Sequence, residues 1–96
     1  MTVNWRILVV EDDQHLALGL RINLEAEGYE VIHVTSAEEG LRLLEVTSVD
    51  LVILDLMLPG MSGMEALERI RSIDLKLPVL ILTARSSLTD KVEGLR

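Results

Sequence analysis

Residues 51–60 read LVILDLMLPG, and this stretch decides the fold. Four apolar residues in a row, Leu51 to Leu54, are typical of a strand that is buried on both faces of a sheet. Asp55 ends that strand, and a Pro-Gly loop follows within a few residues. In an open parallel sheet, ligands bind beyond the carboxyl ends of the strands. A carboxylate at this position therefore predicts catalytic chemistry or metal binding.

Apolar strands and amphipathic helices alternate along the rest of the chain. The patterns predict strands over residues 5–10, 29–34, 49–55 and 78–83. They predict helices over residues 14–27, 36–46, 62–73 and 87–95. Strands that are separated by helices run parallel, with right-handed crossovers and helices on both faces of the sheet. The sequence thus predicts one α/β domain, a doubly wound parallel sheet of the order β-α-β-α-β-α-β-α.

Short signals support these boundaries. Residues 36–39 and 62–65 read SAEE and SGME, and each has the Ser-x-x-Glu pattern of a capping box at a helix start. Gly28 follows a helical stripe and suits the left-handed position that ends a helix. In the first helix, Leu18 and Ile22 lie opposite the main apolar stripe. They are either isolated exposed residues or the contact surface of a missing neighbouring element.

Composition bounds the function. The chain has 96 residues, of which 49% are hydrophobic and 26% charged, so one folded domain is expected. The formal net charge of −7 argues against direct nucleic-acid binding, which needs a basic surface. There is no cysteine, no apolar run long enough for a membrane span and no signal-peptide pattern. These features together predict a cytoplasmic protein.

Acidic residues follow two of the predicted strands. Glu11, Asp12 and Asp13 end the first strand, as Asp55 ends the third. In the usual doubly wound order these strands are direct neighbours, about 5 Å apart. Carboxylates crowded in this way either raise a pKa or recruit a cation. Oxygen ligands without histidine or cysteine favour Mg²⁺ or Mn²⁺ over Zn²⁺.

Helix capping is the alternative explanation of these acids. A carboxylate at a helix start accepts hydrogen bonds from free N–H groups and interacts favourably with the helix dipole. Asp13 directly precedes the predicted helix, so capping is the preferred role there. For Glu11 and Asp12 alone the two roles are evenly balanced. Asp55 has no capping role, and it moves the balance for those two toward a metal site.

Three motifs together resemble a known family. Residues 7–13 read ILVVEDD, residues 54–63 read LDLMLPGMSG and residues 80–85 read LILTAR. In this order they are similar to the receiver domain of bacterial two-component response regulators. The nearest resemblance is to the branch that carries a winged-helix DNA-binding domain, and it covers essentially the whole chain.

The resemblance implies a flavodoxin-like fold with strand order 2-1-3-4-5. It implies that Asp55 accepts a phosphoryl group from a phosphohistidine of a sensor kinase, and that the domain is a switch for transcription rather than an enzyme. Glu11, Asp12 and Asp55 match the Mg²⁺ ligands, Asp12 directly and Glu11 through water, with Mn²⁺ as an alternative ion. Met57 matches a ligand through its backbone carbonyl, and Thr83 matches the switch hydroxyl.

The sequence departs from the family at its end. Family members continue past Arg96 with a fifth strand that carries a lysine, a fifth helix and an output domain. We therefore expect residues 1–96 to form an incomplete receiver domain, with Mg²⁺ binding retained and phosphorylation impaired. The open edge of the strand over residues 78–83 is expected to support a homodimer or other self-association.

Two other functions remain open. A protein-interaction module without phosphorylation would keep the fold and bind partners through the acidic face. A metal-dependent phosphohydrolase also uses an aspartate at a strand end. The second alternative is weaker, because Met57 stands where such enzymes commonly have a second acid.

Overall fold

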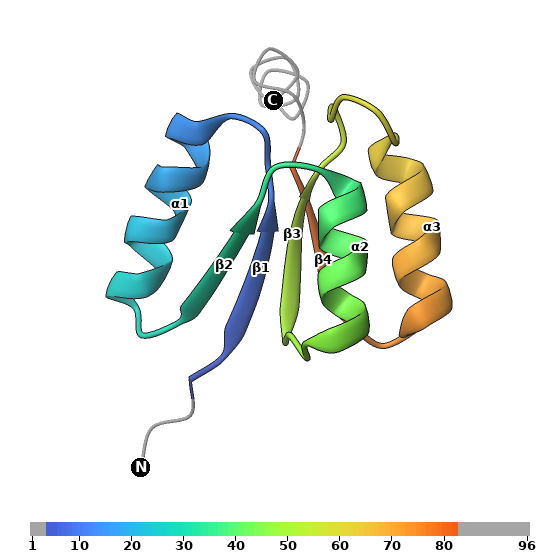
Figure 1. The fold of residues 1–96 in the computed structure, drawn as a ribbon. Coiled ribbons are helices and arrows are strands. Elements are labelled where there is room, and N and C mark those ends of the chain that lie inside the picture. Colours follow the sequence, from blue (N-terminus) through green and yellow to red (C-terminus); the bar gives the residue numbers. More distant parts are fainter. Residues whose placement is uncertain (1–3, 83–96) are drawn as a thin grey trace, which may run out of the picture.

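The computed structural model of the chain describes residues 4–82 (Figure 1). Its strands are β1 (Arg6–Val10), β2 (Glu30–Val34), β3 (Leu51–Asp55) and β4 (Val79–Leu82). Its helices are α1 (Gln14–Ala26), α2 (Ala37–Val46) and α3 (Gly63–Ile73). Each strand begins one or two residues later than the apolar pattern predicts. No helix within residues 4–82 is long and apolar enough to cross a membrane.

The strands form one parallel sheet in the order β2-β1-β3-β4. This is the predicted doubly wound order, as far as the described strands extend. The prediction for Thr83 and the predicted helix over residues 87–95 lie outside the described residues.

The helices cover both faces of the sheet, with α1 on one face and α2 and α3 on the other (Figure 1). Successive side chains of a strand point to opposite faces. One apolar cluster accordingly joins alternate strand residues to α2 and α3, and it includes Leu8, Val10, Val52, Leu54, Ala37, Ala66 and Ile70. The other cluster lies against α1 and includes Ile7, Val9, Val31 and Ile53 with Leu20 and Leu24 packed on them. Burial on both faces explains the continuous apolar runs of the central strands.

Side chains cap the starts of all three helices, as the sequence predicts. The carboxylate of Asp13 accepts from the backbone of α1, and the hydroxyls of Ser36 and Ser62 accept from Glu39 N and Glu65 N. The carboxylate of Glu39 accepts hydrogen bonds from the Thr35 and Ser36 hydroxyls, which lower its pKa. These caps satisfy N–H groups that the helix itself leaves free.

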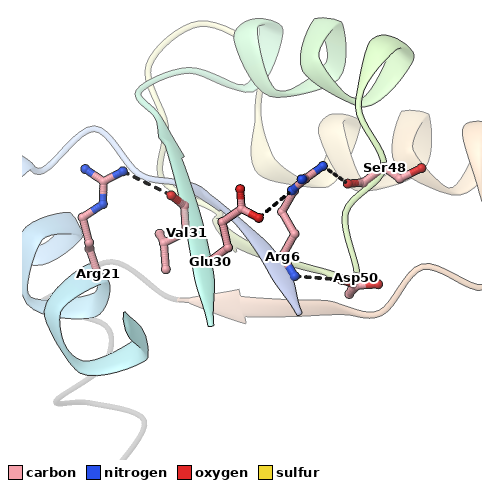
Figure 2. Close-up of polar contacts among 6 residues, drawn as sticks. All are labelled: Arg6, Arg21, Glu30, Val31, Ser48 and Asp50. Atoms are coloured by element: carbon pink, nitrogen blue, oxygen red, sulfur yellow. Dashed lines mark hydrogen bonds and ion pairs between the residues drawn. The ribbon is translucent and has the colours of Figure 1, made fainter. Parts of the chain in front are cut away.

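Arg6 connects three segments at the amino-terminal edge of the sheet (Figure 2). Its backbone N–H donates to Asp50 Oδ2 at 2.7 Å. Its guanidinium donates to Glu30 Oε1 at 3.1 Å and to the Ser48 carbonyl at 3.2 Å. These contacts fix how β1, β2 and the segment before β3 start relative to one another. Because β1, β2 and β3 have the same length, strands that start side by side also end side by side, so their carboxyl ends lie together.

Candidate functional site

Three carboxylates meet at the carboxyl edge of the sheet. Glu11 and Asp12 follow β1 directly, and Asp55 is the last residue of β3. The pairing of Val10 with Leu54 places these two strand ends side by side. Carboxylate oxygens of Glu11, Asp12 and Asp55 lie within 4.8 Å of one another. The predicted convergence of these acids is therefore confirmed.

Two of the three acids are removed from solvent. Glu11 is 0% exposed and Asp55 is 4% exposed, whereas Asp12 is exposed. Burial raises the pKa of Glu11 from 4.5 to about 7, and the negative charge of Asp55 adds to the rise. A hydrogen bond from Asp13 N to Glu11 Oε2, 3.0 Å long, opposes it. The cluster thus concentrates negative charge that burial does not favour.

One oxygen of this cluster has no hydrogen-bond partner within residues 4–82. Glu11 Oε1 is fully buried and makes no hydrogen bond to any described residue. An unpaired buried carboxylate oxygen costs free energy, and a cation at the cluster would remove that cost. All three side chains offer oxygen donors, which hard divalent ions such as Mg²⁺ prefer. The donor set and the orphaned oxygen fit such an ion.

The loop after β3 orients Asp55. The Met57 backbone N–H donates to Asp55 Oδ1 at 2.9 Å, so the carboxylate has a fixed direction. The Met57 side chain itself is 64% exposed. Gly60 has a φ of 80°, a left-handed conformation that glycine adopts without strain.

Gly63 allows α3 to begin directly against this loop. A Cβ at Gly63 would lie 2.4 Å from the Leu56 Cα atom and 3.1 Å from the Asp55 carbonyl oxygen. Only glycine fits at such a distance from backbone atoms. The close approach holds the residues after Asp55 in place.

Asp13 has the capping role that the sequence favours. Its Oδ1 accepts from the backbone N–H groups of His15 at 2.9 Å and Leu16 at 3.1 Å. This cap holds the start of α1 directly behind Asp12. Asp13 is not among the residues that the geometry groups as a possible metal site.

His33 is a site neighbour that the sequence did not indicate. Its ring Nε2 lies 2.7 Å from the Glu11 backbone carbonyl oxygen. The sequence contains no signal for this position, because this histidine shows no metal-ligand spacing. Its position follows from the pairing of β2 with β1, which sets Val9 beside His33.

Known proteins share this architecture and much of the sequence. Residues 7–96 match the family model for the response regulator receiver domain. The chain is 48% identical over 89 residues to the uncharacterized transcriptional regulatory protein YkoG of Bacillus subtilis. This match covers 93% of the chain and 39% of that protein. It is 49% identical over 90 residues to the transcriptional regulatory protein BasR of Escherichia coli. This match covers 94% of the chain and 40% of that protein. The chain thus spans about two-fifths of the length of these relatives.

Solved structures agree with the fold. The response regulator TrrA of Thermotoga maritima in complex with Mg²⁺-BeF superposes with a TM-score of 0.80 at 32% identity, covering 96% of this chain and 99% of that one. A crystal structure of the histidine kinase ThkA in complex with TrrA contains a chain that matches with a TM-score of 0.79 at 39% identity, covering 83% and 69%. The family match, the identities and the shared fold agree. This chain belongs to the response regulator receiver domain family.

Proposed function

We propose that this chain is a phosphoacceptor switch in which Asp55 receives a phosphoryl group from a phosphohistidine of a sensor kinase. The observation that carries the proposal is the group of Glu11, Asp12 and Asp55. Their carboxylate oxygens lie within 4.8 Å of one another, and one buried oxygen has no hydrogen-bond partner among the described residues. In this proposal all three acids hold Mg²⁺, or Mn²⁺ in its place, together with the Met57 carbonyl. Thr83 would contact the phosphoryl group as the switch hydroxyl.

The phosphoryl transfer is a single displacement at phosphorus. A carboxylate oxygen of Asp55 forms a bond to phosphorus, and the bond between phosphorus and the donor imidazole nitrogen breaks. The electron pair of that bond stays on the imidazole, and the product is an acyl phosphate. When bound, Mg²⁺ supplies positive charge that offsets the charge of the phosphoryl oxygens. The Met57 N–H contributes by holding the Asp55 carboxylate in one orientation.

The relatives support the wider role. YkoG and BasR are named transcriptional regulatory proteins, and TrrA has been crystallised with a histidine kinase. By analogy this chain is a signalling module that controls transcription through a separate output domain and acts in the bacterial cytoplasm, where the DNA lies. The net charge of −7 disfavours direct contact of this chain with nucleic acid.

We also propose that the chain self-associates through β4. Among the described strands, β4 pairs on one side only, with β3, and its Leu80 is 53% exposed. A strand edge with exposed apolar side chains can pair with a second copy. Sedimentation velocity is expected to show a dimer or larger species, and a single monomeric species at high concentration would contradict this.

Beryllofluoride tests the phosphoacceptor role, because it mimics a phosphoryl group on a carboxylate. With Mg²⁺ present, the fluorine NMR spectrum of the protein is expected to contain a bound beryllofluoride signal, which Asp55→Asn abolishes. Asp74→Asn is the matched control, since Asp74 is an exposed acid at the far end of α3. If the wild-type chain gives no bound signal, or if Asp55→Asn keeps it, the chain is better described as a protein-interaction module with an acidic face.

A further inference from the structure

His33 lies beside the acidic cluster but belongs to another strand. It is the fourth residue of β2, and its half-buried ring shares a small hollow of about 100 Å³ with Gln14, Ala17, Leu18 and Arg21 of α1. Its Nε2 is 2.7 Å from the Glu11 carbonyl oxygen. A carbonyl oxygen only accepts hydrogen bonds, so the histidine nitrogen carries the proton and donates.

The Glu11 carbonyl belongs to the peptide group that precedes Asp12. On the other side of Asp12, the next peptide group is also held, because Asp13 N donates to Glu11 Oε2 at 3.0 Å. Glu11 N in turn donates to the Val34 carbonyl at 3.1 Å. Two planar peptide groups with fixed orientations determine the direction of the Cα–Cβ bond between them, and the backbone torsions restrict which rotamers the side chain adopts. Asp12 is exposed, so burial does not restrict its carboxylate.

We propose that His33 is a positioning residue for metal binding, which aims the Asp12 carboxylate by holding the peptide group between Glu11 and Asp12. The proposal rests on the proposed function, because Asp12 matters as a Mg²⁺ ligand. His33 contacts neither the ion nor the phosphoryl group in this scheme. Its contribution is to limit the directions that Asp12 samples, which lowers the entropy that the carboxylate loses when the ion binds.

A set of four variants tests this role through the Mg²⁺ dissociation constant, measured by calorimetry. His33→Leu removes the donor and is expected to weaken Mg²⁺ binding about tenfold. His33→Gln keeps an N–H near the position of Nε2 and is expected to restore most of the affinity. His33→Asn carries its amide closer to the backbone, so it is expected to behave like His33→Leu and serves if that variant does not fold.

Arg21→Gln is the matched control. Arg21 also donates from a side chain to a carbonyl of β2, that of Val31 at 3.1 Å (Figure 2). Val31 precedes His33 by two residues and pairs with Ile7, near the start of β1. Its loss is expected to lower the thermal stability of the chain without weakening Mg²⁺ binding, since removal of a positive charge does not disfavour a cation. A merely structural role for His33 predicts the same behaviour for His33→Leu.

A metal-free readout separates this inference from the proposed function. Without Mg²⁺, the backbone amide NMR signal of Asp12 is expected to shift in His33→Leu and to stay near the wild-type position in His33→Gln and Arg21→Gln. An unshifted Asp12 amide, or wild-type Mg²⁺ affinity in both His33→Leu and His33→Asn, would overturn the positioning role alone. A wild-type chain that binds no Mg²⁺ would overturn the proposed function, and the metal role of His33 with it.

Discussion

Glu11 and Asp55 are two buried acids whose carboxylate oxygens lie within 4.8 Å of each other, an arrangement that costs stability unless a cation is present. Both lie at strand ends that the parallel sheet brings together. Their burial and like charges disfavour full ionisation of the pair. In the proposed function, this pair destabilises the metal-free state, and a bound cation removes that cost.

This cost can be measured with Asp55→Asn. The variant removes one charge from the cluster and keeps an oxygen that accepts from the Met57 N–H. We expect the free energy of unfolding of the metal-free protein to rise by about 1 kcal/mol in urea denaturation with a chelator present. The control Asp74→Asn is expected to change it by less than about 0.5 kcal/mol. A loss of stability in Asp55→Asn would contradict electrostatic crowding at the site.

The pKa of Glu11 predicts how metal-free stability depends on pH. Its pKa rises from 4.5 to about 7 on folding, so the folded state holds the proton more tightly than the unfolded state. The resulting stabilisation is complete below the unfolded pKa and is lost as the pH rises through the folded pKa. Urea denaturation with chelator at about pH 5 and about pH 8 is expected to show this loss. If Glu11→Gln loses as much stability over the same range, Glu11 is not the group responsible.

The sequence predicts some residues of the site but not others. Glu11, Asp12 and Asp55 were predictable because strand ends of a parallel sheet meet at one edge, and Asp13 because it precedes a helix. His33 was not predictable, since its contact with the Glu11 carbonyl depends on the register of β2 against β1 and on the direction of one ring. The spacing of apolar residues along the sequence gives neither the strand register nor the direction of the ring.

At the scale of elements, the junction between β3 and α3 controls the shape of the site. Gly63 begins α3 so close to Leu56 that no side chain fits between them. The pattern Ser-x-x-Glu predicted the helix start, and Ser62 does cap it. It did not predict that the second residue of the pattern must be glycine, because that requirement comes from backbone atoms of another segment.

Gly63→Ala tests this junction. The new Cβ meets the Leu56 Cα atom, which cannot move without displacing the loop that carries Met57. We expect a loss of about 1–3 kcal/mol in the free energy of unfolding, together with weaker Mg²⁺ binding. Gly19→Ala is the matched control, since nothing lies within 4 Å of its Cβ position inside α1. That change is expected to stabilise the protein by up to about 1 kcal/mol. Equal effects of the two substitutions would show that the close contact at Gly63 is unimportant.

At the scale of the whole molecule, the edge of the sheet where the strands begin and the edge where they end have different roles. At the amino-terminal edge, Arg6 joins segments through hydrogen bonds to Asp50, Glu30 and Ser48 (Figure 2). At the carboxyl edge, β1 and β3 lead into the acids Glu11, Asp12 and Asp55. The layered arrangement was predictable from apolar strands that alternate with amphipathic helices. The Arg6 network was not, since it joins residues far apart in the sequence at positions that only the assembled sheet defines.

Binding of Mg²⁺ to the folded chain is expected to stabilise the whole molecule. An ion that binds only the folded state, at about 100 times its dissociation constant, adds roughly 2.7 kcal/mol to the free energy of unfolding. Thermal unfolding with and without Mg²⁺ measures this gain, and we expect Asp55→Asn to reduce it strongly. A gain of the same size in Asp55→Asn would place the ion elsewhere.

The central claim is that Asp55 forms an acyl phosphate in a reaction that needs the acidic cluster. The most direct measurement incubates the chain with Mg²⁺ and phosphoramidate, a small donor with a phosphorus–nitrogen bond, and identifies the modified residue by hydroxylamine trapping and mass spectrometry. We predict trapping at a single carboxyl group, that of Asp55, which depends on Mg²⁺ and is absent in Asp55→Asn. No trapped group in the wild-type chain, or trapping that persists in Asp55→Asn, would contradict the claim.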